Sequence, residues 1–304
     1  MNKSKHHYKL SELCKSAGFS KQAHAAYLNR RNNNFAKYDL VFNVVSHTRE
    51  MHPQMGLKKI FCLLSPDTIG RDRFIEIGCE LGLALPKPKN YQRTTFSYKS
   101  ATFKNVAATV NINDINIVWV SDITYFPIYN KFYYITFIMD VYSRRILGYN
   151  AADSMRAEES CKALNMAIEA RKGYCMKKLI HHSDKGSQYC SNAYLGILND
   201  NNIAVSMCNN VYENTHIERV NGTMKNEYLL HRNINNFSAL CKYLDEDVYN
   251  YNNSRPHWAI NCMSPVEYEK YLSNFPLNQR TVLNMFSDNE INHSQKFVLP
   301  LLFT

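Results

Sequence analysis

The sequence has no long hydrophobic run, little glycine or proline, and fewer acidic than basic residues. No stretch of its 304 residues approaches the roughly 18 consecutive apolar side chains that a membrane-spanning helix requires. With only 10 Gly and 9 Pro, the chain is neither collagen-like nor of low complexity. The N-terminus is polar and basic, with no hydrophobic segment behind it, and is unlike a signal peptide. We therefore expect a globular cytoplasmic protein that does not contact a membrane.

Cysteine is present but shows no pairing pattern. The nine cysteines are scattered and form no C-x-x-C motif, and their odd number argues against a disulfide framework. The adjacent His181 and His182 have no second His or Cys cluster with the spacing of zinc ligands. Apolar residues make up 45% of the chain, which suffices for a large core, and its length suits two domains.

The excess of positive charge lies entirely in the first third of the chain. Residues 1–110 contain 18 Lys and Arg against 7 Asp and Glu, whereas the remainder contains 18 against 19. This asymmetry favours a nucleic-acid-binding region joined to a near-neutral domain, although a solvated basic surface is an alternative. DNA is therefore the predicted partner.

The basic third is predicted to form short helices separated by glycine-containing turns. Apolar spacing predicts helices near residues 10–14, 20–27, 41–50, 57–64 and 71–82. This pattern is typical of helix-turn-helix units, and helical bundles of other function share it. We assign residues 1–85 to a helix-turn-helix DNA-binding region and residues 86–110 to a basic linker. The candidate DNA contacts are basic residues at helix starts: Lys21, Lys58, Lys59, Arg71 and Arg73.

From residue 117 the periodicity becomes that of β-strands. Apolar, β-branched runs at 117–126, 132–139 and 146–149 predict three antiparallel strands. A helix at 157–171, a strand at 178–184, a helix near 194–198, a strand at 203–207 and a long helix at 214–229 follow. This order predicts an α/β domain with a mixed sheet covered by helices. We place it at residues 111–275 and leave the tail, 276–304, unassigned.

Three carboxylates interrupt or follow these predicted elements. Asp122 interrupts an apolar strand, Asp184 ends the fourth strand, and Glu218 lies on the long helix. Converging carboxylates suit Mg²⁺, which prefers oxygen ligands and leaves positions open for phosphate. Lys225 falls on the helix face of Glu218, where a cation suits a DNA phosphate. Other acidic residues fit equally well from spacing alone: Asp114 or Asp140 as the first ligand, and Glu213 or Glu227 as the third.

Several runs resemble, in order, the sequence blocks of bacterial insertion-sequence transposases of the IS-three group. They are HPQMGLKKI at 52–60, WVSDITY at 119–125, IMDVYSR at 138–144, HHSDKGSQY at 181–189, ERVNGTMK at 218–225 and YNNSRPH at 251–257. The catalytic domain of that family is similar to retroviral integrase and ribonuclease H. The resemblance implies a ribonuclease H-like mixed five-stranded sheet with flanking helices, preceded by an all-α helix-turn-helix region.

The same resemblance implies a DDE transposase in which Asp122, Asp184 and Glu218 are the catalytic residues and metal ligands. It implies two Mg²⁺ ions, replaceable by Mn²⁺, and DNA strand cleavage followed by strand transfer. The implied partners are the element's terminal inverted repeats, target DNA, further copies of the chain, and an upstream-frame protein or frameshift fusion, in association with the bacterial nucleoid. Two alternatives stay open, namely a ribonuclease H-like nuclease without strand transfer and a catalytically silent DNA-binding regulator.

Overall fold

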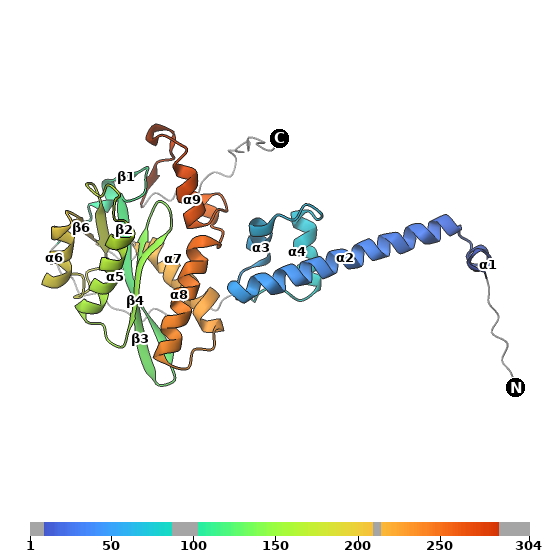
Figure 1. The fold of residues 1–304 in the computed structure, drawn as a ribbon, viewed down its shortest axis with the longest axis horizontal. Coiled ribbons are helices and arrows are strands. Elements are labelled where there is room, and N and C mark those ends of the chain that lie inside the picture. The colour runs from blue at the N-terminus through green and yellow to red at the C-terminus, as the bar shows by residue number, and fades with distance from the viewer. Residues whose placement is uncertain (1–8, 87–102, 209–213, 286–304) are drawn as a thin grey trace. The chain divides into compact units, whose positions relative to one another are not determined.

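The computed structural model describes residues 9–86, 103–208 and 214–285, and the chain forms two compact units, 1–89 and 90–304 (Figure 1). The described part of the first unit is helical. Its helices are α1 (Leu10–Ser16), α2 (Lys21–Met51), α3 (Leu57–Leu64) and α4 (Arg71–Glu80). No described helix combines the length and the apolar character that crossing a membrane would take.

Helix α2 corrects the prediction of separate helices at 20–27 and 41–50. It begins as expected at Ser20, whose hydroxyl accepts a hydrogen bond from the Ala23 N–H over 3.0 Å. It then runs without a break for 31 residues, because no glycine or proline interrupts the segment. Its buried side chains all belong to its C-terminal half, which packs with α3 and α4 around Ile60 and Phe74.

The second unit is built on a five-stranded mixed sheet of strand order β4-β3-β2-β5-β6. The strands are β2 (Val118–Ile128), β3 (Lys131–Asp140), β4 (Ile146–Ala152), β5 (Ile180–Ser183) and β6 (Ala204–Met207). Strands β2, β3 and β4 are antiparallel neighbours, whereas β5 runs parallel to both β2 and β6. The predicted ribonuclease H-like sheet is therefore confirmed.

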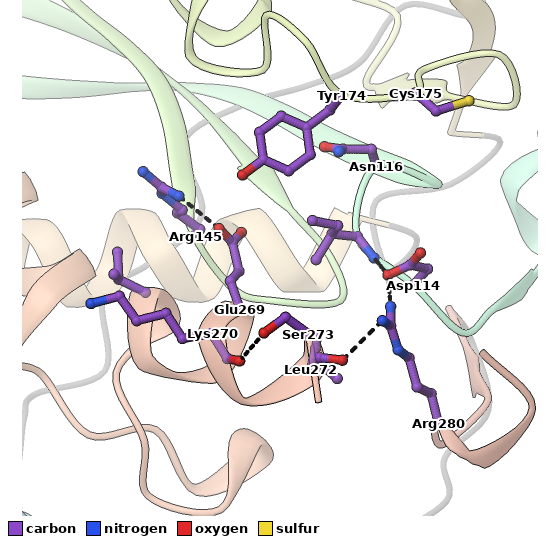
Figure 2. Close-up of a pocket in the computed structure, with 12 residues that line it drawn as sticks. Asp114, Asn116, Arg145, Tyr174, Cys175, Glu269, Lys270, Leu272, Ser273 and Arg280 are labelled. Carbon is purple, nitrogen blue, oxygen red and sulfur yellow. Dashed lines mark hydrogen bonds and ion pairs between the residues drawn. The ribbon is translucent and has the colours of Figure 1, made fainter. Parts of the chain in front are cut away.

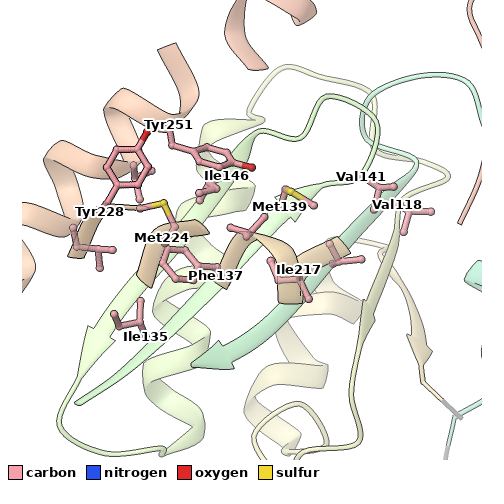
Figure 3. Close-up of a cluster of buried hydrophobic side chains, with 14 of the residues drawn as sticks. Val118, Ile135, Phe137, Met139, Val141, Ile146, Ile217, Met224, Tyr228 and Tyr251 are labelled. Carbon is pink, nitrogen blue, oxygen red and sulfur yellow. The ribbon is translucent and has the colours of Figure 1, made fainter. Parts of the chain in front are cut away.

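Helices cover both faces of this sheet and divide its core in two. The helices are α5 (Ala157–Ala170), α6 (Asn192–Asp200), α7 (Thr215–Thr223), α8 (Phe237–Asn253) and α9 (Pro265–Leu272). Alternate β2 residues face opposite sides, so Trp119 packs with α5 and α6, whereas Val120 packs with α7 and α8. Figure 3 shows the buried cluster on the α7 and α8 side of the sheet, in which Ile217 and Tyr228 lie near strand residues such as Phe137.

The predicted long helix at 214–229 is an α-helix for only part of its length. After α7 the chain widens into a π-helical segment, η3 (Met224–Tyr228), and then tightens into a 3₁₀ turn, η4 (Leu229–His231). The adjacent Gly222 and β-branched Thr223 are both weak helix formers, which weakens α-helical continuation at this point. Met224 and Tyr228 are both buried, so the wider turn still packs against the sheet.

Segments that precede and follow the sheet and its helices in the sequence also belong to the second unit. Residues 103–110, taken as linker, lie against β6, where the Ala107 N–H donates to the Ser206 hydroxyl over 3.1 Å. Part of the unassigned tail forms β7 (Leu283–Asn284), which pairs antiparallel with β1 (Asn111–Ile112). The β1–β7 pairing therefore joins the segment before the five-stranded sheet to the segment that follows α9.

Candidate active site

The register of β2 and β5 brings Asp122 and Asp184 to the same level of the sheet. Ser121 pairs with Ser183 across the two parallel strands, and an aspartate follows each of these serines in the sequence. Helix α7 adds Glu218, which lies one turn before Asn221. The side-chain amide of Asn221 donates to Asp122 Oδ2 over 2.8 Å and fixes α7 beside β2.

Electrostatics relates Asp122 to the other two carboxylates. Burial, followed by the negative charges of Asp184 and Glu218, raises the pKa of Asp122 to about 7. Asp184 remains exposed at its surface, but partial burial of its carboxyl raises its pKa, an effect that the Gly186 N–H opposes by donating to Oδ1 over 3.0 Å. A bound cation relieves repulsion of the kind that Asp122 experiences.

The carboxylate oxygens of Asp122, Asp184 and Glu218 are of the kind that a hard divalent cation prefers, although they do not form a completed site. No three His, Cys, Asp or Glu side chains among the described residues have the spacing of a completed metal site. The three carboxylates come from β2, from the residue after β5 and from α7, and all offer oxygen atoms.

A buried polar network supports the strands behind the carboxylates. The hydroxyls of Ser121 and Tyr189 lie 2.9 Å apart, and Tyr194 O–H lies 2.9 Å from His181 Nε2. Burial lowers the pKa of His181 to about 3, so this ring is neutral. His182 is equally buried and contacts Ser206. Both histidines thus have a structural role.

The rival carboxylates have other partners. Asp140 is fully buried and accepts hydrogen bonds from the backbone N–H groups of Asn116, Tyr142 and Ser143, so it holds a turn together. Asp114 pairs with Arg280, and Glu227 forms a two-point ion pair with the buried Arg255. Glu213 lies outside the described residues.

The predicted DNA contacts fall into different environments. Lys225 is half-buried, with Nζ 4.1 Å from the centroid of the Tyr125 ring, and burial lowers its pKa. In the first unit Lys21 and Lys58 are exposed, and Lys59 is half-buried.

The two arginines of α4 are already paired. Arg71 lies 2.9 Å from Asp72, and Arg73 lies 2.7 Å from Glu76 and 3.4 Å from Glu80. Their charges are largely compensated within the helix, which makes them weaker candidates for DNA binding than their position suggested.

Sequence reasoning missed Asn221. The signal was present, because the run ERVN places an amide one helical turn after Glu218. Its Oδ1 is buried without a hydrogen-bond partner among the described residues, so its orientation depends on the bond to Asp122.

A pocket of about 490 Å³ opens elsewhere in the second unit (Figure 2). Its charged lining residues neutralise one another: Arg145 contacts Glu269 over 2.6 Å, and Asp114 pairs with Arg280. None of the three carboxylates lines it. The pocket is therefore separate from the candidate active site.

Comparison with known proteins agrees with the motifs. Two family models described as integrase core domain match residues 113–211 and 202–265. The chain is 34% identical to the insertion element IS600 31 kDa protein of Shigella sonnei, over 67% of this chain and 76% of that protein. It is 30% identical to the transposase for insertion sequence element IS629 of the same organism, over 73% and 75%.

Among solved structures, the chain is similar to the magnesium-bound catalytic core domain of HTLV-2 integrase. The TM-score is 0.42 at 19% identity, over 51% of this chain and 96% of the integrase domain. The extent of the sequence matches, rather than this structural likeness, decides the family. The chain belongs to the insertion-sequence transposases that carry an integrase core domain.

Proposed function

We propose that this chain catalyses DNA strand cleavage and strand transfer, with Asp122, Asp184 and Glu218 as a DDE catalytic triad. The carrying observation is that the β2–β5 register places Asp122 and Asp184 at one level of the sheet, and that burial, followed by the charges of Asp184 and Glu218, raises the pKa of Asp122. Integrase core domains at residues 113–211 and 202–265 span these positions.

Asp122, Asp184 and Glu218 would hold divalent metal, Mg²⁺ or Mn²⁺, and we propose two ions. When bound, these ions supply Lewis-acid activation of a water or 3′-hydroxyl and stabilise the leaving oxygen. Glu218 is exposed on α7 and can reach toward the aspartates without disturbing the sheet. Asn221 keeps one oxygen of Asp122 engaged, which limits the directions in which that carboxylate can bind.

Lys225 is proposed to orient the DNA backbone. Its ammonium group is held over Tyr125, which is itself exposed on β2 three residues beyond Asp122. A positively charged group fixed in this way can bind a phosphate without losing much side-chain entropy. The exposed Lys21 and Lys58 are proposed as additional phosphate contacts in the first unit.

The proposed substrates are the terminal inverted repeats of an insertion sequence and a target duplex. Joining two DNA ends to one target requires more than one active site, so we propose that several copies of the chain assemble on DNA. An upstream-frame protein, or a frameshift fusion with it, is the proposed additional partner.

The test is strand transfer by the purified full-length chain with Mg²⁺ and terminal-repeat DNA. Asp184→Asn should abolish strand joining, whereas Asp200→Asn, which removes an exposed carboxylate from α6, should leave joining unchanged. Equal joining by Asp184→Asn and wild type would refute the triad. Cleavage of DNA without joining would identify a ribonuclease H-like nuclease, and DNA binding without cleavage would identify a silent regulator.

A further inference from the structure

The N-terminal half of α2 contributes no buried side chain within the described part of the first unit, and its neighbours lie near its start, where α1 contacts α2 and the Phe19 ring stacks on His24. Residues 21–36 are exposed except for the half-buried His24, and the buried side chains of the helix begin at Val41. Figure 1 shows this half of α2 extending beyond α3 and α4. Because the C-terminal half is anchored in the core of the unit, the exposed half is held out as a helical arm with its surface open to a partner.

The charged residues of this arm are all basic. Between Leu13 and Tyr38 the sequence contains five Lys or Arg residues and no Asp or Glu. Arg30 Nε donates to the Ala26 carbonyl over 3.3 Å, and the Arg31 guanidinium lies 5.4 Å from the centroid of the Phe35 ring. Both arginines therefore contact only their own helix, and neither meets a carboxylate among the described residues.

Helical spacing gathers these groups on one side. Tyr27, Arg30, Asn34 and Lys37 follow one another at intervals of three or four residues, so they share one face, with Arg31 beside it. The buried residues of the C-terminal half continue the same face into the core of the unit. The direction of the basic face is thus fixed by packing at its far end.

Helix α4, which also belongs to the predicted helix-turn-helix region, is a poorer DNA-binding surface. It carries two arginines but three acidic residues, Asp72, Glu76 and Glu80, so its net charge is negative. Its arginines are paired with these carboxylates. A DNA phosphate would have to displace those partners, whereas Arg30 and Arg31 of α2 have no carboxylate to displace among the described residues.

We propose that the exposed half of α2 is the main surface of the first unit for double-stranded DNA. Arg30, Arg31 and Lys37 bind phosphates, and Asn34, which lies between Arg30 and Lys37 on the face, points toward the groove. An α-helix has the width of the major groove, and no acidic side chain on this stretch opposes entry. The inference rests on the proposed function for the identity of the ligand.

The experiment compares two charge-matched double variants of the full-length chain, Arg30→Ala/Arg31→Ala and Arg71→Ala/Arg73→Ala. Alanine is the strongest helix former, so neither pair weakens its helix, and circular dichroism verifies this. Binding to a short random-sequence duplex is measured by fluorescence anisotropy at increasing NaCl. We expect the α2 pair to raise Kd at least tenfold and to reduce the slope of log Kd against log salt by about two units, roughly one for each phosphate that the variant no longer binds.

The α4 pair should change Kd by less than about threefold, as expected for residues in surface ion pairs. Equal losses from the two pairs, or a larger loss from the α4 pair, would overturn the proposal. A second result would also overturn the proposal. If the α2 pair bound DNA with wild-type affinity and Phe35→Ala changed the oligomeric state, the arm would be a contact between copies of the chain.

Strand transfer measured in parallel separates this inference from the proposed function. A wild-type chain that binds DNA through α2 but joins no strands refutes the proposed function alone. A chain that joins strands while Arg30→Ala/Arg31→Ala retains wild-type affinity and salt dependence refutes the role of α2 alone.

Discussion

Asn221 and Asp122, 99 residues apart in the sequence, are joined by a 2.8 Å hydrogen bond from the Asn221 amide to Asp122 Oδ2. The bond links α7 to β2 at the level of the three carboxylates. It makes the orientation of a proposed metal ligand depend on a neutral neighbour, and this relation can be tested directly.

Asn221→Ala should raise the Mg²⁺ concentration needed for half-maximal strand transfer by roughly 10–100-fold, because Asp122 would lose the donor that orients it. The affinity for DNA should not change. The control is Asn199→Ala, which removes an exposed amide from α6. A wild-type Mg²⁺ requirement in Asn221→Ala would show that the hydrogen bond has no role in metal binding.

Asp184→Asn should make the metal-free protein more stable while it abolishes strand transfer. The negative charge of Asp184 opposes ionisation of Asp122, so its removal at neutral pH should raise the melting temperature by roughly 2–4 °C. Mg²⁺ should then raise the melting temperature of the wild type but not of the variant. Equal stabilisation of both proteins by Mg²⁺, reversed by EDTA, would place the ion elsewhere.

Gly148→Ala should destabilise the second unit by about 3 kcal/mol, the cost of severe overpacking. A methyl group at this β4 position would lie 2.0 Å from the Ala163 carbonyl oxygen of α5, a backbone atom that cannot move aside. The matched change Gly196→Ala on α6 meets open space and should stabilise the helix by up to about 1 kcal/mol. Urea unfolding of both variants gives the comparison, and similar effects would contradict the close approach of β4 to α5.

Acid should destabilise the second unit partly through His181. Burial lowers its pKa to about 3 in the folded state, whereas an unfolded histidine titrates near 6.5. As pH falls below about 6.5, His181 binds a proton in the unfolded state but not in the folded state. The free energy of unfolding therefore declines by about 1.4 kcal/mol per pH unit.

His181→Phe removes this titration, and its loss of stability between pH 6.5 and pH 5 should be about 2 kcal/mol smaller than that of the wild type. Fluorescence of the buried Trp119 can follow the unfolding. Parallel pH profiles of the two proteins would mean that His181 is protonated without penalty.

The strands of the second unit could be predicted from sequence because β-branched alternation and tight turns are local signals. The same holds for the cap of α2 at Ser20. The continuity of α2 was missed because its polar middle lacks apolar periodicity, and helix propensity without glycine or proline decided the outcome. The π-helical turn at Met224–Tyr228 likewise depends on packing against the sheet.

For the candidate site, the motifs selected the three carboxylates, but only the fold shows how they are related. The pairing of Ser121 with Ser183 is a contact across 62 positions of sequence, and no local pattern specifies it. The pairing of Arg73 with Glu80 could be found only from the geometry of α4. The contact of Arg73 with the Tyr38 ring could be found only from the packing of α4 against α2. The catalytic assignment itself stays a prediction until the variants are measured.

The pairing of β1 with β7 has a consequence for how such a protein can be rearranged. Residues Ile112 and Leu283 face each other across this two-stranded ribbon, so two segments of the second unit that are 171 positions apart in the sequence lie side by side. A unit with adjoining ends can be inserted into, or excised from, another polypeptide without reshaping its interior. We therefore expect that a different DNA-binding module could be attached to the second unit at the β1–β7 ribbon without changes to the five-stranded sheet.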